Sequence, residues 1–106
     1  MTTALPKKVL VGPLVFDVAA VAGAKDWGLT DLQAGTITLR AGMTPEMQRW
    51  ILAHEVMHAA LFASGVMDDA NDLTLTEEAW VARTSPLFAD ALQRSPGLAE
   101  FLAGAA

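Results

Sequence analysis

The sequence predicts an α+β domain in which a small N-terminal sheet packs against the helices that follow it. Residues 8–40 contain short apolar segments with β-branched residues, whereas the later segments are longer and have helical periodicity. No repeat or low-complexity linker separates these two parts. Strands that precede helices around one core are typical of α+β folds. The chain has 106 residues, so we expect residues 1–106 to form one minimal domain.

The expected sheet is small and antiparallel, with about three strands. Residues 8–18 read as a first strand that bends or bulges at Gly12-Pro13, because proline cannot donate to a central ladder. This strand should therefore lie near a sheet edge. Residues 19–25 are alanine-rich and are expected to form a helical turn, after which residues 27–29 form a brief strand before a turn at Thr30-Asp31. Residues 36–40 alternate between polar and apolar side chains, which predicts a half-buried strand.

Helices are expected in the rest of the chain. The first begins at the N-cap Thr44, has Pro45 at its first helical position and stops at Gly65. A polar loop over residues 65–73 leads to a second core helix from about Thr76 to Leu92. A short third helix follows Ser95-Pro96, with Ser95 as its cap.

The first helix carries His54-Glu55-Val56-Met57-His58, an HExxH pattern that contains both histidines of the chain. Positions i and i+4 of a helix lie one above the other, so both imidazoles can reach one metal ion while Glu55 stands beside it. In zinc hydrolases with this pattern, the ion lowers the pKa of a water molecule and the neighbouring carboxylate takes its proton. The pattern predicts His54 and His58 as metal ligands and Glu55 as the catalytic base.

The surroundings of the motif favour this interpretation over a chance match. Between Arg49 and Asp68, only the two histidines and Glu55 are charged or ionisable. A helix that is apolar on every side is expected to be buried, and a buried carboxylate rarely lacks a partner. Without a metal, three polar groups would need separate buried partners. The remaining large residues of interest, Trp27, Trp50 and Trp80, are interpreted as packing residues, with the last two near a helix–helix contact.

A catalytic zinc site with two histidines needs a third protein ligand. In the second helix, Glu77 falls on the apolar stripe and Glu78 lies to one side of it. We therefore predict that Glu77 completes a His-His-Glu site, with Glu78 in reserve. Residues 74–77 also fit a capping box, in which Glu77 would bond back to the N-cap amide. The other acids near the motif are in the preceding loop: Asp68, Asp69 and Asp72.

Composition restricts the partners and the metal chemistry. A net charge of −5 without a basic cluster argues against nucleic acid. The absence of cysteine leaves only nitrogen and oxygen donors for a metal. Lys7-Lys8 and the apolar run after them resemble a secretory signal, but Gly12, Pro13 and Asp17 interrupt the run. We expect a cytoplasmic protein, with export as the minor alternative, and no membrane-spanning segment.

These residues resemble the gluzincins, the HExxH metallopeptidases with a downstream glutamate, and among them the small ImmA/IrrE-like metallo-endopeptidase domains of phages and prophages. The resemblance rests on Pro45–Ala59, which reads P-E-x-Q-R-x-x-L-x-H-E-x-x-H-A, and on the glutamate-led helix after it. It implies one zinc ion per chain, held by His54, His58 and an acid of the Glu77-Glu78 pair. It also implies Glu55 as general base and a protein or peptide substrate, such as a regulatory protein.

Two features depart from that family. Its third-ligand helix often reads E-x-x-A-N, whereas residues 77–82 here read E-E-A-W-V-A. Family members also use a tyrosine or a further histidine to stabilise the oxyanion, and this chain has no tyrosine and no third histidine. Arg49, Arg83, Lys25 or a backbone N–H would have to replace it. The alternative function is a catalytically weak or inactive, metal-stabilised protein-interaction module. A cleft for an extended peptide, edged by the strand of residues 36–40, would favour proteolysis.

Overall fold

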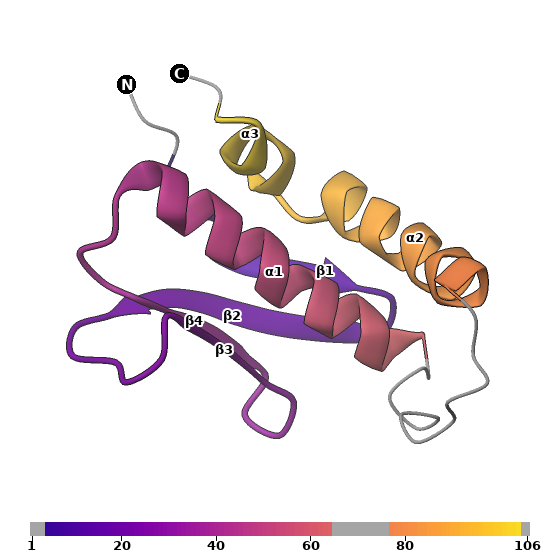
Figure 1. Cartoon of the computed structure of the whole chain (residues 1–106), viewed down its shortest axis with the longest axis horizontal. Coiled ribbons are helices and arrows are strands. Elements are labelled where there is room, and N and C mark those ends of the chain that lie inside the picture. The colour runs from indigo at the N-terminus through magenta and orange to yellow at the C-terminus, as the bar shows by residue number, and fades with distance from the viewer. Residues whose placement is uncertain (1–3, 65–76, 105–106) are drawn as a thin grey trace.

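The sheet and the helices form two layers. The computed structural model describes residues 4–64 and 77–104, apart from the side chains of Glu77 and Glu78. Within those residues, three helices cover one face of a four-stranded sheet (Figure 1). The predicted α+β class is confirmed, with strands first and helices after them. The helices are α1 (Pro45–Ala63), α2 (Glu77–Arg94) and α3 (Leu98–Ala103).

The sheet has one strand more than expected and one parallel pair. Its strands are β1 (Lys8–Val11), β2 (Leu14–Val21), β3 (Gly28–Asp31) and β4 (Thr36–Arg40), in the spatial order β1-β2-β4-β3. The pairs β1·β2 and β3·β4 are antiparallel, and β2·β4 is parallel. Strand β4 is therefore an inner strand, and the edges of the sheet are β1 and β3. The strand of residues 36–40 was expected to form the edge of a peptide-binding cleft. This expectation is wrong, because β3 pairs with the outer side of β4 and is itself the edge strand.

Residues 8–18 form a hairpin and not one bulged strand. Val11 pairs with Leu14, so that Gly12 and Pro13 alone make the turn. Gly12 has a φ of 55°, which glycine adopts without strain, and Pro13 sits where the ladder needs no N–H donor. The expected helical turn over residues 19–25 is also wrong: β2 continues to Val21 because β4 pairs with it along residues 17–21.

The core lies between the sheet and the helices. Inward side chains of β1, β2 and β4 meet apolar residues of all three helices. The fully or almost fully buried apolar set is Val9, Val11, Phe16, Ile37, Leu39, Leu52, Val56, Ala59, Ala60, Ala91, Leu98 and Phe101. The other face of the sheet is solvated and carries exposed residues such as Val15 and Leu29. Gly28 and Thr30, which pair with Leu39 and Ile37, share the inner face and thus point toward α1.

Local signals predicted α1 well. The Thr44 hydroxyl accepts a 3.3 Å hydrogen bond from the Met47 N–H, and Pro45 begins the helix. The helix ends at Ala63 with Ser64 as C-cap, whereas the predicted stop at Gly65 lies outside the described residues. The predicted loop over residues 65–73 lies outside them too. In the described ranges, no helix has both the length and the apolar character needed to cross a membrane.

The third helix begins differently from the prediction. Its N-cap is Gly97, which makes no side-chain capping bond, so the predicted Ser95 cap is wrong. Ser95 is buried and its hydroxyl instead bonds to the backbone of Leu10 in β1. The capping rule identified a helix end, but a partner 85 positions away in sequence takes the hydroxyl.

Helix α1 is also less enclosed than its composition indicated. One of its faces covers the sheet and another contacts α2, but a third faces solvent. Trp50 is 68% exposed and Met57 is 40% exposed on that open side. Trp27, just before β3, is 51% exposed. Trp27 and Trp50 are thus not core residues, which corrects their interpretation as packing residues. The open face of α1 is the one that carries His54.

Candidate metal centre

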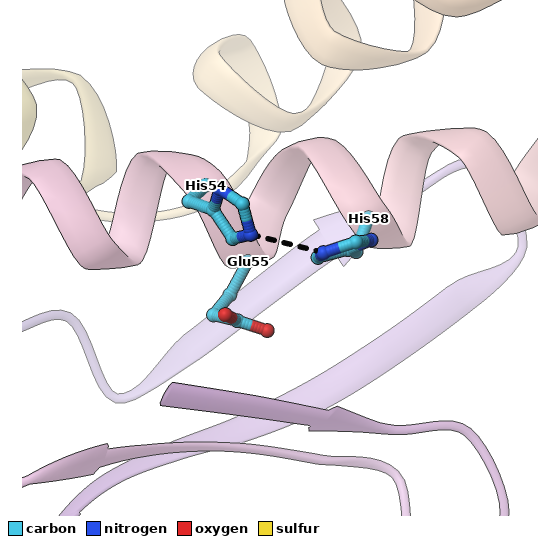
Figure 2. Close-up of side chains that lie close together, drawn as sticks. All are labelled: His54, Glu55 and His58. Atoms are coloured by element: carbon cyan, nitrogen blue, oxygen red, sulfur yellow. Dashed lines mark hydrogen bonds between the residues drawn. The ribbon is translucent and has the colours of Figure 1, made fainter. Parts of the chain in front are cut away.

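His54 and His58 lie on successive turns of α1 with their rings facing each other (Figure 2). Their Nε2 atoms are 3.0 Å apart, and the rings meet edge to face with centroids 4.7 Å apart. Two nitrogens bound at about 2.0–2.1 Å to a tetrahedral zinc ion lie about 3.3 Å from each other. The pair is therefore close to the separation that one metal ion requires. Without an ion, one imidazole can donate its N–H to the lone pair of the other.

Glu55 points from α1 toward the sheet (Figure 2). The residue is only 6% exposed. The hydroxyl of Thr30 lies 2.8 Å from Glu55 Oε1 and 3.1 Å from the Glu55 backbone oxygen. A hydroxyl carries one hydrogen and donates to one of these acceptors at a time. Through either acceptor, Thr30 links β3 to the turn of α1 that carries Glu55, and the shorter contact is the one to the carboxylate.

Gly28 permits this close approach of β3 to α1. A Cβ atom at position 28 would lie 2.6 Å from Ile51 Cγ2 and 3.0 Å from both Cγ and Oε2 of Glu55. Any side chain there would have to displace Glu55 or the strand. Sequence reasoning missed the roles of Gly28 and Thr30. A glycine inside a strand pattern often marks close backbone approach, and that signal could have identified position 28.

His54, Glu55 and His58 form a group that could hold a metal ion. One ligand atom from each lies within 4.8 Å of the others. The buried carboxylate sits beside two imidazoles that are at least partly open to solvent. Imidazole nitrogens such as those of His54 and His58 are among the donors that zinc prefers, and the Glu55 carboxylate lies beside them. The donor chemistry therefore fits the metal that the motif predicted.

The structure brings together three of the predicted site residues. The predicted third ligand, Glu77, and its reserve, Glu78, begin α2, but their side chains lie outside the described residues. The alternative acids Asp68, Asp69 and Asp72 lie outside them as well. The choice of third ligand therefore stays a prediction.

A cleft opens beside the group, between the start of β3 and the N-terminal half of α1. It measures about 420 Å³ and is lined by Asp26, Trp27, Gly28, Trp50, Ile51, His54 and Glu55. This volume is in the range of sites that bind small molecules or short segments of a larger ligand. The guanidinium of Arg40 lies 4.3 Å from the centre of a Trp27 ring, which holds that indole in place at the cleft. The exposed tryptophans therefore form walls of the cleft that contains Glu55.

The basic residues considered for oxyanion stabilisation do not line this cleft. Arg49 lies on the far side of α1 from His54, with its guanidinium next to Gly104 at the end of α3. Lys25 and Arg83 are exposed, and neither forms part of the wall. Among the described residues, the cleft therefore shows no cationic side chain in the oxyanion role.

Comparisons with known proteins add no evidence about this group of residues. No protein-family model matches this chain, and comparisons with curated proteins and with solved structures also find no match. The gluzincin resemblance therefore rests on the residues of the motif and the helix that bears them. The structure adds that His54, Glu55 and His58 lie close together beside a cleft.

Proposed function

We propose that this chain is a zinc-dependent metallo-endopeptidase in which Glu55 acts as general base. The observation that carries the proposal is the His54-Glu55-His58 group, whose two Nε2 atoms are 3.0 Å apart and whose carboxylate is buried at the cleft wall. A bound zinc ion would supply a Lewis acid that polarises the substrate carbonyl and acidifies water. The resemblance further favours a regulatory protein in the cytoplasm as the substrate, and a phage or prophage setting.

The chain's own residues have separate roles in this proposal. His54 and His58 hold the ion, and Glu77, or Glu78 in reserve, completes its protein ligands. Glu55 takes the proton of the attacking water and later returns it to the leaving amine. Thr30 fixes the orientation of Glu55 through its 2.8 Å contact. A carboxylate that is held in one orientation loses less freedom on the way to the transition state.

The edge strand β3 is suited to an extended peptide. It pairs only with β4 among the described strands, and its first residue, Gly28, lines the cleft beside Glu55. A peptide added to a free sheet edge gains backbone hydrogen bonds regardless of its sequence. Its scissile bond could then reach the histidine pair. This placement favours a peptide over a small amide or ester.

Metal content tests the ligand set. Protein purified without added metal should contain about one zinc ion per chain, as expected for three protein ligands with the fourth position open to water. His58→Ala and Glu77→Ala should lose it, whereas Glu78→Ala should keep it. The wild type should also melt at a lower temperature after chelation, because the ion binds only the folded chain. A wild type that binds no zinc, even after reconstitution, would contradict the proposal.

Activity tests the role of Glu55. Glu55→Gln should keep its zinc and lose hydrolysis by about 10²–10⁴-fold, the usual contribution of a general base. Glu46→Gln is the matched control, because Glu46 is an exposed glutamate in the first turn of the same helix. Cleavage of a peptide library by the wild type and by Glu46→Gln, but not by Glu55→Gln, is the expected pattern. Equal rates in all three proteins would remove Glu55 from the mechanism.

The second candidate function is a metal-stabilised protein-interaction module without peptidase activity, and the position of Arg49 favours it. That residue lies next to Gly104 and on the far side of α1 from His54, so one predicted oxyanion partner is not at the site. The module would bind zinc and lose thermal stability on chelation, yet cleave no peptide of the library. The same metal and activity measurements therefore separate the two functions.

A further inference from the structure

One end of the cleft is lined by residues that the proposed mechanism does not use, namely Asp26, Trp27 and Trp50. Trp50 precedes His54 by about one turn of α1, so it lies on the same face of the helix, about 6 Å nearer its start. Asp26 and Trp27 come directly before Gly28 at the start of β3. These three residues, called the aromatic end of the cleft, therefore border the candidate metal ligands.

The indole of Trp50 is open to a ligand. Trp50 is the most exposed large apolar side chain in the described ranges, at 68%. No aromatic ring or cation of those ranges lies against it, because the ring contacts are those of the histidine pair and of Arg40 with Trp27. Indoles are enriched at binding surfaces, since they bury a large apolar area and attract cations to their faces. Trp50 offers both properties to a molecule in the cleft.

The charges available in the cleft are negative. Asp26 and Glu55 line it, whereas its described lining contains no lysine or arginine. The Asp26 carboxylate makes no hydrogen bond or ion pair within the described part of the chain. The two nearest cations, Lys25 and Arg40, lie outside the lining, and the guanidinium of Arg40 donates to backbone carbonyl oxygens of residues 24 and 25. Because Glu55 serves catalysis, Asp26 is the charge that remains for a ligand, and it favours a cation.

We propose that the aromatic end binds the side chain of an arginine or lysine of the peptide substrate, so that the peptidase cuts close to a basic residue. The apolar stem of that side chain lies along Trp50, and its charged group meets the Asp26 carboxylate and the indole faces. Residues of an extended peptide are about 3.3 Å apart, so the basic residue stands within about two positions of the scissile bond. This inference rests on the proposed function and adds the substrate class.

Citrulline provides the neutral control for this preference, because it has the shape of arginine without the charge. A position-scanned library of octapeptides, analysed by mass spectrometry, would first locate the scissile bond of the best substrate. Arginine and citrulline would then be compared at each of the two positions on either side of that bond. We expect kcat/KM to be about tenfold higher for arginine at one of them, from a cation–π contact and a partly exposed ion pair. A ratio near one at every position overturns the assignment.

Asp26→Asn and Asp17→Asn form a matched pair of variants. Each removes one negative charge from an exposed aspartate, but Asp26 lines the cleft and Asp17 stands on the solvated face of the sheet. Asp26→Asn should lower the arginine-to-citrulline ratio by about threefold without slowing cleavage of the citrulline peptide, whereas Asp17→Asn should leave the ratio unchanged.

Asp26→Lys reverses the charge and should bring the arginine-to-citrulline ratio below one. Zinc content confirms that each variant is folded around its metal. An unchanged ratio in zinc-loaded Asp26→Lys contradicts the proposal.

A binding measurement separates the aromatic end from the peptidase. The chain has three tryptophans, so a ¹⁵N-labelled sample gives three indole N–H signals, which Trp27→Phe and Trp50→Phe assign. In the zinc-loaded wild type, millimolar N-acetyl-arginine amide should shift the Trp50 signal, and N-acetyl-citrulline amide should shift it far less. Cleavage without arginine preference and without this shift would overturn the basic subsite and leave the peptidase. A shift in a protein that cleaves no peptide would overturn the peptidase and leave a binding site for basic side chains.

Discussion

The two edges of the sheet differ in what lies against them. Along β1, side chains from the end of α2 and the residue after it bond to backbone groups of the strand and of the turn that follows it. Along β3, no described segment pairs with the outer edge, and its inner face meets Glu55 through Gly28 and Thr30. Within residues 4–64 and 77–104, one edge is thus closed by side chains and the other is open beside the candidate metal site.

The closed edge is held by three residues of α2 and its end. Ser95 Oγ accepts a 2.8 Å hydrogen bond from Leu10 N–H. Asp90 accepts one of 2.9 Å from Gly12 N–H, and Arg94 donates one of 2.7 Å to the Gly12 carbonyl. Arg94 and Asp90 also bond to each other. These contacts satisfy backbone groups that would otherwise attract another strand.

The contrast shows how the fold separates stability from function. Exposed strand edges invite unwanted pairing, so natural proteins usually cover them. Here the edge that is far from the motif is covered, whereas none of the described strands pairs with the edge that borders the cleft. A free strand edge beside a hydrolytic group can bind an extended peptide substrate through backbone hydrogen bonds. Substitutions on the inner face of β3 should therefore affect activity, and substitutions at the β1–α2 contact should affect stability alone.

Gly28→Ala should have the largest effect on the open edge. The new Cβ would lie 2.6 Å from Ile51 Cγ2 and 3.0 Å from Glu55 Oε2, so Ile51 has to shift and the carboxylate is pressed from its position. A displacement of about 1 Å can lower the rate by about 10²-fold, and overpacking lowers the free energy of unfolding by about 1–3 kcal/mol. Peptide hydrolysis and chemical denaturation measure the two effects. Leu29→Ala, on the solvated face of the same strand, is the control, and full activity in a folded Gly28→Ala protein would contradict this account.

Thr30→Val tests the same edge more gently. Valine keeps the shape of threonine but removes the hydroxyl that lies 2.8 Å from Glu55 Oε1. Loss of a hydrogen bond to a charged group should lower kcat/KM by about tenfold and leave the zinc content unchanged. Thr38→Val is the matched control, because Thr38 pairs with Leu29 and shares the solvated face. Similar activities for the two variants would show that Thr30 does not orient Glu55.

The same contrast explains which parts could be predicted from the sequence. Helix α1 and its motif depend on local signals, namely the Thr44 cap, Pro45 and the i, i+4 spacing of the histidines, and these were confirmed. The α+β order follows from the change of periodicity along the chain. Such features need no knowledge of distant residues.

The sequence-based predictions were wrong where a residue distant in sequence determines the local structure. Residues 19–21 are strand because β4 pairs with them, although alanine favours helix. Ser95 bonds to Leu10 and not to its own helix. The packing of β3 against α1 determines two further features. These are the exposure of Trp27 and Trp50 and the need for glycine at position 28. Tertiary contacts of this kind leave only weak traces in a single sequence, such as a glycine inside a strand pattern.

Ser95→Ala should open part of the closed edge. Ser95 is 3% exposed, and the loss of its hydroxyl leaves the part-buried Leu10 N–H without its partner. The free energy of unfolding should fall by about 1–3 kcal/mol, while peptide hydrolysis at a temperature where the protein is folded stays the same. Ser85→Ala, an exposed serine of α2, should change stability by no more than about 0.5 kcal/mol. An activity loss in Ser95→Ala that exceeds its unfolded fraction would break the proposed separation.

Lowering the pH should have the smallest effect on stability, and it acts through Asp90 at the same closed edge. The hydrogen bond from Arg94, and after it the one from Gly12 N–H, holds the pKa of Asp90 below its usual value. A lowered pKa means that the ionised carboxylate stabilises the fold above about pH 4, the pKa of an unfolded aspartate, and that this contribution is lost as the pH falls through the folded pKa.

Thermal melting at pH 7, 5, 4 and 3 measures this contribution. The difference in melting temperature between the wild type and Asp90→Asn should be constant from pH 7 to 5 and shrink below pH 4. Arg94→Gln should have the same effect, because Arg94 is the main cause of the lowered pKa. Both side chains are partly solvated, at 46% exposure for Arg94 and 30% for Asp90, so solvent screens the pair and the shift should be small. A difference that grows toward pH 3 would mean that Asp90 stabilises the β1–α2 contact by some means other than its charge.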